Sequence, residues 1–235
     1  ELLELLEALD APGESEVDRL KRRESWDPVD LLVPEWNYLL TEPPGDHHED
    51  RDSGLVVSPR SLGDVPAGVS RVLAVDRLRK VNAVLGFTRV DDYDRVEDSE
   101  ARLVSLVRSG RPTWVPATED RGEGIFIQLD EDAVARWETR VLASDVWASH
   151  RAAHRRNFER RFSETAKQVS PDERLAPPRY WLVHTLAHAL IRQMAMSSGY
   201  GAASISERLY AWRATEQREA AAGMLLTTTA SDSDG

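Results

Sequence analysis

The chain has 235 residues, of which 41% are hydrophobic and 30% are charged, a composition that is ordinary for a globular protein. It contains no cysteine, so these residues alone supply neither a disulfide framework nor a thiolate metal site. The formal net charge of −11 argues against a protein that coats nucleic acid by bulk attraction. No apolar run approaches the roughly 18 residues that span a bilayer. The acidic N-terminus lacks the basic region of a signal peptide, so we expect a cytoplasmic protein with no membrane partner.

Three regions of different composition follow one another along the chain. Residues 1–53 open with a leucine-rich helical pattern and end in an exposed loop rich in Pro, Gly, Asp and His. The pattern begins without a start methionine, so we expect preceding residues to be missing. Residues 54–145 are expected to be rich in strands, with a following helix. Residues 146–235 are expected to be helical and to end in a strand.

The strand pattern predicts an α+β fold with a short mixed or antiparallel sheet. β-branched and aliphatic residues indicate strands at about 71–75 and 81–90, separated by a charged step at 76–80. Two more strands are expected at 111–118 and 124–129, and a tight turn at 119–123 explains the neighbouring glycines. A last strand is expected at 224–229.

The helical pattern predicts a long polar helix and a buried C-terminal helix. Asp130 is a good N-cap for the polar helix, and a second helix is expected from about 145 to 167. Residues 180–196 form a strongly apolar helical segment that has to be largely buried. Ser204 and Glu207 have the spacing of a capping box, which predicts a short helix that ends near Trp212.

The apolar segment carries a polar seam made of His184, His188 and Arg192, which lie on one side of the helix. Two histidines at positions i and i+4 can share a metal ion, as in the pattern His-Glu-x-x-His of zinc proteases. Here Thr185 replaces the glutamate that acts as general base, and no third ligand follows at helical spacing. We therefore expect no metal, and we interpret the seam as buried polar groups at a packed or partner interface. A buried Arg192 would need an anionic partner.

Residues 151–162 contain the one dense cluster of basic side chains. On a helix, Trp147, Phe158 and Phe162 share a face that should pack inward, and the arginines lie opposite or beside that face. We predict that DNA phosphates contact the side chains of Arg155, Arg156 and Arg160. A solvated helix face held by salt bridges to neighbouring glutamates is the alternative.

Four blocks in order resemble the DrmB family, a helicase-associated family of bacterial defence loci. The blocks are Leu85–Arg89, Arg121–Phe126, His184–Arg192 and Gly199–Tyr210, and the acidic, glycine-ended segment 230–235 resembles a turn of the same family. The resemblance covers about residues 69–235, and its specificity comes from the ordered co-occurrence of the blocks.

The resemblance implies a core component of DISARM, a system that restricts incoming phage DNA. In it, the protein would be a non-motor subunit that binds a DrmA-like helicase subunit and helps to engage DNA. Family members commonly carry a cysteine cluster, which is expected to bind metal, beyond the acidic turn. These residues hold no cysteine, so we expect no cofactor in them; either the chain is a piece of a zinc-binding full-length protein or this member has lost the site.

The sequence shows no complete nucleotide-binding or catalytic motif, so we expect a non-catalytic subunit whose activity comes from the helicase partner. The segment Arg121-Gly122-Glu123-Gly124 lacks the lysine of a phosphate-binding loop and does not lead from a strand into a helix. Two alternatives from other classes remain: a metal-dependent hydrolase built on His184 and His188, and an interaction scaffold that never touches nucleic acid.

Overall fold

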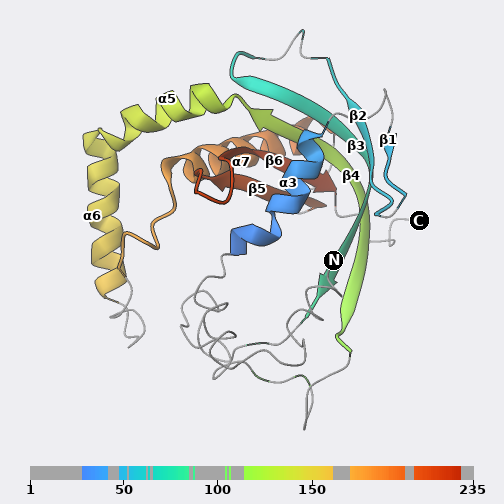
Figure 1. Ribbon diagram of the computed structural model, residues 1–235, viewed down its shortest axis with the longest axis horizontal. Coiled ribbons are helices and arrows are strands. Elements are labelled where there is room, and N and C mark those ends of the chain that lie inside the picture. The colour runs from blue at the N-terminus through green and yellow to red at the C-terminus, as the bar shows by residue number, and fades with distance from the viewer. Residues whose placement is uncertain are drawn as a thin grey trace. The chain divides into compact units, whose positions relative to one another are not determined.

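The computed structural model divides the chain into two compact units, residues 1–41 and 42–235. It describes residues 28–41, 48–51, 53–61, 63, 66–84, 87, 104, 106, 114–160, 170–198 and 204–228. In the first unit, the described residues form a short 3-10 helix, Pro28–Leu31, followed by α3, Val33–Leu40. The second unit contains the sheet and the helices that carry the candidate sites (Figure 1).

The second unit is an α+β fold with an antiparallel sheet, as the sequence predicts. Its elements in chain order are β1 (His48–Glu49), β2 (Val56–Pro59), β3 (Val69–Ala83), β4 (Ala117–Leu129), α5 (Glu131–Leu142), α6 (Asp145–Glu159), α7 (Pro178–Ser198), β5 (Ile205–Trp212) and β6 (Ala221–Thr228). The sheet has the order β1-β2-β3-β4-β6-β5, and each neighbouring pair is antiparallel. No described helix combines the length and the apolar character that crossing a membrane requires.

The two long strands β3 and β4 correct the prediction of shorter strands separated by turns. Residues 76–80 and 119–123 lie inside continuous strands that pair with each other, and a β-bulge between Val75 and Leu78 absorbs the irregularity. Oppositely charged side chains stabilise the pairing, because Nε of Arg79 lies 2.8 Å from Oε2 of Glu119 across the two strands. A charged run therefore continues a strand when the facing strand supplies the opposite charge. Figure 1 shows the two curved strands side by side.

The sequence predicts that Gly122 and Gly124 belong to a turn. Instead, both lie within β4, at positions where β6 passes close to it. Gly124 pairs with Thr227, and a Cβ atom on Gly124 would overlap the carbonyl oxygen of Leu226. A Cβ atom on Gly122 would overlap the carbonyl oxygen of Thr228 in the same way. The two glycines are thus explained by the close approach of two backbones.

Both polar helices begin at a side-chain cap, and the cap of α5 is the one that the sequence predicts. The side chain of Asp130 accepts a hydrogen bond from the backbone N–H of Ala133 at the start of α5, over 2.7 Å. The side chain of Ser144 accepts one from the backbone N–H of Trp147 at the start of α6. Residues 161–169, with Phe162 and the expected last turns of this helix, lie outside the described residues.

The segment 205–212 forms strand β5, and the prediction of a capped helix there is wrong. β5 pairs over its whole length with β6, from Ile205 opposite Thr228 to Trp212 opposite Ala221. The local capping pattern was compatible with a helix, but eight paired residues and two packed faces favour the strand. Because this segment is a strand, the alternation of side chains along β5 sets the direction of the Glu207 side chain.

Helix α7, which the sequence predicts, covers one face of β5 and β6 and forms the core with them (Figure 1). The helix contributes Val183, Ala187 and Ile191, which are spaced four residues apart and therefore share one face. From the sheet, alternate residues of β5 and β6 face the helix: Ile205, Leu209, Ala211, Ala222, Met224 and Leu226. By the same alternation, Glu207 stands on the helix-facing side of β5.

Candidate functional site

The polar side of α7 opens to solvent, whereas the sequence predicts a buried seam. The side chains of His184 and His188 are 32% and 58% exposed, and Arg192 is exposed as well. The reason is the rotation of the helix: Val183 and Ala187 point at the sheet, so the residues that follow each of them lie at the margin of the contact. Arg192 therefore needs no buried anionic partner.

Glu207 of β5 meets the two histidines at this margin. Nε2 of His184 lies 2.8 Å from Nε2 of His188 and 3.2 Å from Oε1 of Glu207. Nε2 of His188 lies 3.6 Å from the same carboxylate oxygen. Three potential ligand atoms thus converge on one point, two from adjacent turns of α7 and one from the edge strand of the sheet. We call His184, His188 and Glu207 the triad.

The sequence reasoning missed Glu207 as a member of this cluster. It assigned the glutamate to a capping box, which would have placed the side chain at a helix start. A usable signal is the alternation in 205–211, where Ile205, Leu209 and Ala211 predict an apolar face that Glu207 interrupts. A carboxylate on an otherwise apolar face requires a partner, and in this fold the nearest partners are the histidines of α7.

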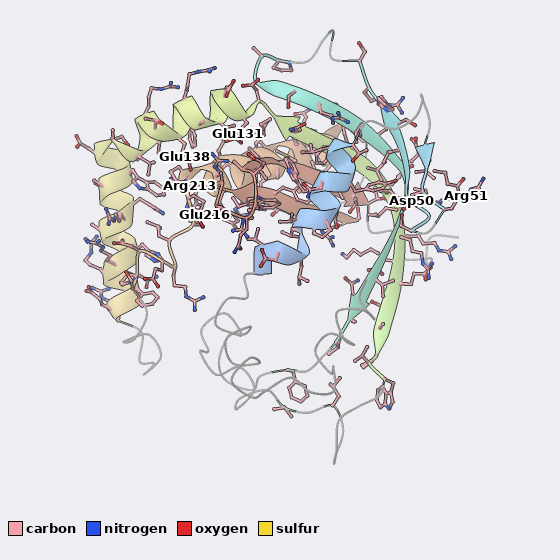
Figure 2. All side chains as sticks on the ribbon, viewed as in Figure 1. Asp50, Arg51, Glu131, Glu138, Arg213 and Glu216 are labelled. Atoms are coloured by element: carbon pink, nitrogen blue, oxygen red, sulfur yellow. The ribbon has the colours of Figure 1, made fainter. Side chains whose placement is uncertain are left out.

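A second polar cluster, which the sequence reasoning also missed, surrounds the buried guanidinium group of Arg179. Its Nη2 lies 2.9 Å from Oε2 of Glu138 and 2.9 Å from Oε1 of Glu131. Its Nη1 also donates to the backbone carbonyls of Trp212 and Ala221. Figure 2 shows Glu131 and Glu138 on α5, with Arg213 beside them from the segment that joins β5 to β6.

The two charges at the centre of this cluster have little access to water. The side chains of Arg179 and Glu138 are 4% and 7% exposed. Burial by itself raises the pKa of Glu138, but the hydrogen bonds and charge of Arg179, assisted by Arg213, outweigh it and hold the pKa below its ordinary value. The cluster ties α5, the first turn of α7 and the β5–β6 connection together, so we assign it to stability. Its sequence signal is Glu131, Val134 and Glu138 on one face of α5.

The basic cluster on α6 is partly neutralised. Nε of Arg151 and Nε of Arg155 lie 2.9 and 3.0 Å from Oδ1 of Asp172, which stands in the segment before α7. These two hydrogen-bonded arginines lower the pKa of Asp172 well below its ordinary range. Arg156 and Arg160 are exposed, and neither forms an ion pair with another described residue. Of the three predicted DNA contacts, two therefore reach solvent without an ion pair to another described residue, and the third, Arg155, is paired with Asp172.

Comparison with known proteins gives one informative match. No family model matches the chain. A region of 166 residues, which is 71% of this chain, is 30% identical to the DISARM protein DrmB of Bacillus paralicheniformis. The matched region spans 28% of the length of that protein. The similarity supports a DrmB-family relationship for this chain, in agreement with the four sequence blocks.

Proposed function

We propose that this chain is part of a non-catalytic, DrmB-like subunit of a bacterial anti-phage complex of the DISARM type. The observation that carries the proposal is the 30% identity to the DISARM protein DrmB over 71% of this chain. The absence of a complete nucleotide-binding motif from the sequence supports a subunit that works beside a motor protein. In this proposal the subunit docks on a helicase subunit of the complex and assists its engagement of DNA.

The exposed arginines of α6 are the proposed DNA contact. Arg156 and Arg160 lie four residues apart on the helix, so their guanidinium groups can reach neighbouring phosphates. The net charge of −11 repels DNA at long range, but at physiological salt this repulsion is screened beyond about 8 Å. A local pair of arginines can therefore act although the whole chain is acidic.

The exposed side of α7 is the proposed helicase contact. Arg192 and His188 reach solvent there, at the margin of the contact between the helix and the sheet. An arginine is well suited to such a surface, because its planar guanidinium group pairs with carboxylates through two hydrogen bonds.

The DNA contact is tested by reversing both charges, Arg156→Glu with Arg160→Glu, in the complex with the helicase. The matched control is Arg136→Glu with Arg140→Glu, two exposed arginines at the same spacing on α5. We expect the α6 variant to weaken DNA binding and to reduce the slope of log affinity against log salt by about two. The control should leave both quantities unchanged.

Copurification with the helicase subunit separates the two contacts. The α6 variant should still copurify, whereas Arg192→Glu should reduce copurification and Arg140→Glu should not. If the α6 variant assembles and binds DNA with an unchanged salt slope, the arginines are a solvated surface and the subunit is a scaffold that does not touch DNA. If no variant or wild-type chain copurifies with the helicase, the proposed docking is wrong.

A further inference from the structure

We propose that the triad His184, His188 and Glu207 binds a divalent transition-metal ion, which by its donor set is zinc, and that the ion fastens α7 to the edge strand β5. The proposed function does not require a bound ion here, although His188 also belongs to the proposed helicase contact. The sequence reasoning favoured histidines without a metal, because it found only two ligands.

The distances within the triad suit a single ion. Zinc binds histidine nitrogens and carboxylate oxygens at about 2.0–2.1 Å with tetrahedral geometry, which places neighbouring ligand atoms about 3.3 Å apart. The three observed separations are 2.8, 3.2 and 3.6 Å. The three atoms thus outline one face of a tetrahedron around a common centre. Because His188 is 58% exposed, the fourth position is expected to lie toward solvent.

At most two of the three contacts of the triad can be hydrogen bonds, because 3.6 Å is too long for one between Nε2 of His188 and Oε1 of Glu207. If one histidine carries a proton on Nε2, that N–H group can donate to one or both of the other two atoms. The unprotonated Nε2 of the second histidine then faces the carboxylate oxygen of Glu207, and two lone pairs oppose each other. If both histidines carry it, two N–H groups face each other across the 2.8 Å contact. A cation at the centre accepts a lone pair from each of the three atoms and removes this conflict.

The environment of Glu207 independently favours a cation. Its side chain lies between Ile205 and Leu209 on the helix-facing side of β5 and is 23% exposed. Its second carboxylate oxygen, Oε2, is buried and accepts no hydrogen bond from any described residue. An ionised carboxylate in this position is costly unless a positive charge compensates it.

The donor set selects the class of metal. Two imidazole nitrogens and one carboxylate oxygen suit Zn²⁺ and related transition-metal ions, whereas Mg²⁺ and Ca²⁺ prefer oxygen ligands throughout. Histidines at positions i and i+4 of a helix are a recurrent way to hold zinc. Thr185 follows the first histidine, so the general base of the zinc-protease pattern is missing here. Because two ligands come from α7 and one comes from β5, a bound ion would join the helix to the edge strand.

The test is a titration of the purified, EDTA-treated chain with ZnCl2 and, in parallel, with MgCl2, by isothermal calorimetry. We expect one Zn²⁺ per chain, no response to Mg²⁺, and a melting temperature that rises with Zn²⁺ and falls again with EDTA. Replacing second-sphere partners of metal ligands already costs about 10- to 100-fold in affinity, so His188→Ala and Glu207→Gln should each weaken Zn²⁺ binding at least tenfold. The matched controls, His154→Ala and Glu216→Gln, should bind as the wild type does.

Two results would overturn the proposal: a wild-type chain that binds no Zn²⁺, and binding that survives His184→Ala combined with His188→Ala. If a variant fails to fold, binding of Co²⁺ provides a second test, because this measurement needs only the wild-type chain. Co²⁺ held by imidazole ligands in tetrahedral geometry gives intense visible absorption, which Zn²⁺ should abolish by competition. Weak absorption typical of hydrated Co²⁺ would contradict the site.

Discussion

Arg179 carries a positive charge into the interior of the unit formed by residues 42–235. Its guanidinium group is held by Glu138, by Glu131 and by two backbone carbonyls, and its side chain is 4% exposed. Such a buried ion pair adds little to the free energy of unfolding compared with apolar residues of the same shape. Removing one partner, however, leaves the other charge buried without compensation. The cluster is therefore sensitive to single substitutions on either side.

Arg179→Ala should lower the free energy of unfolding by about 3–5 kcal/mol, because Glu138 would stay buried without its main partner. Urea denaturation measures this change. Arg213→Ala is the matched control, since Arg213 contacts the same carboxylate from a side chain that is 47% exposed, and its cost should be about 1 kcal/mol or less. Equal effects of the two substitutions would show that burial does not set the strength of this cluster.

The lowered pKa of Glu138 predicts a loss of stability in acid. The folded-state pKa lies below the ordinary value of 4.5, so the contribution is complete above pH 4.5 and is lost as the pH falls through the lower, folded-state pKa. The urea concentration at the midpoint of unfolding of the wild type should therefore decrease when the pH is lowered below 4.5. Glu138→Gln should be less stable at neutral pH and should show a shallower decline in acid. A decline as steep as that of the wild type would assign the acid sensitivity to other groups.

Gly124 tests the close approach of β4 and β6. Gly124→Ala should lower the free energy of unfolding by about 1–3 kcal/mol, because its Cβ atom meets the carbonyl oxygen of Leu226 and the strands have to separate. Gly63→Ala provides the control: the Cβ atom there would lie 3.6 Å from Oγ of Ser61, an ordinary contact. An unchanged urea midpoint in Gly124→Ala would contradict the packing of β6 on β4.

At the scale of elements, the sequence predicts best where a local pattern and the tertiary packing agree. Helix α7 and strand β6 follow from apolar runs that the fold buries, and α5 begins at its predicted cap, Asp130. Prediction fails where pairing across the chain decides. The sequence of 119–123 predicts a turn, but in the structure this segment pairs with β3, which supplies the facing charges. The sequence of 205–212 predicts a helix, but in the structure it pairs with β6. Neither partner can be identified from the segment itself.

The candidate site shows the same division. Helical spacing alone places His184 and His188 on one side of α7, but the third member of the triad comes from a strand that the sequence did not predict. The sequence also predicted that His188 and Arg192 are buried, because apolar residues cover most of the circumference of α7, but both side chains are exposed. The rotation of the helix on the sheet, which Val183 and Ala187 reveal, decides which side is open.

The contact between α6 and the segment before α7 predicts how DNA binding can be strengthened. Asp172 neutralises part of the basic cluster by pairing with Arg151 and Arg155. Under the proposed function, Asp172→Asn frees these arginines and should increase the affinity of the complex for DNA severalfold at low salt, with a steeper salt dependence. Asp145→Asn, at the far end of α6, removes the same charge and should have a smaller effect. Identical effects of the two substitutions would indicate a response to net charge alone.

At the scale of the whole molecule, the proposed function places a chain with a net charge of −11 in a complex that engages DNA. The matched region spans 28% of the length of the DISARM protein DrmB, so the role of a whole subunit is a proposal for this chain. The cluster around Arg179 joins α7 to α5, and under the proposed metal binding the triad joins α7 to β5. A firmly held α7 would present its open side, with Arg192, to a partner.

DNA binding by the helicase subunit, measured over a series of salt concentrations with and without this protein, decides between an active subunit and a passive scaffold. We predict that adding the protein raises the affinity for DNA and steepens the dependence of log affinity on log salt, because additional phosphates are contacted. The arginines of α6 should account for a slope change of about two. Affinity and salt dependence that stay the same when the protein is added, although the two subunits assemble, would contradict the proposed role in DNA engagement.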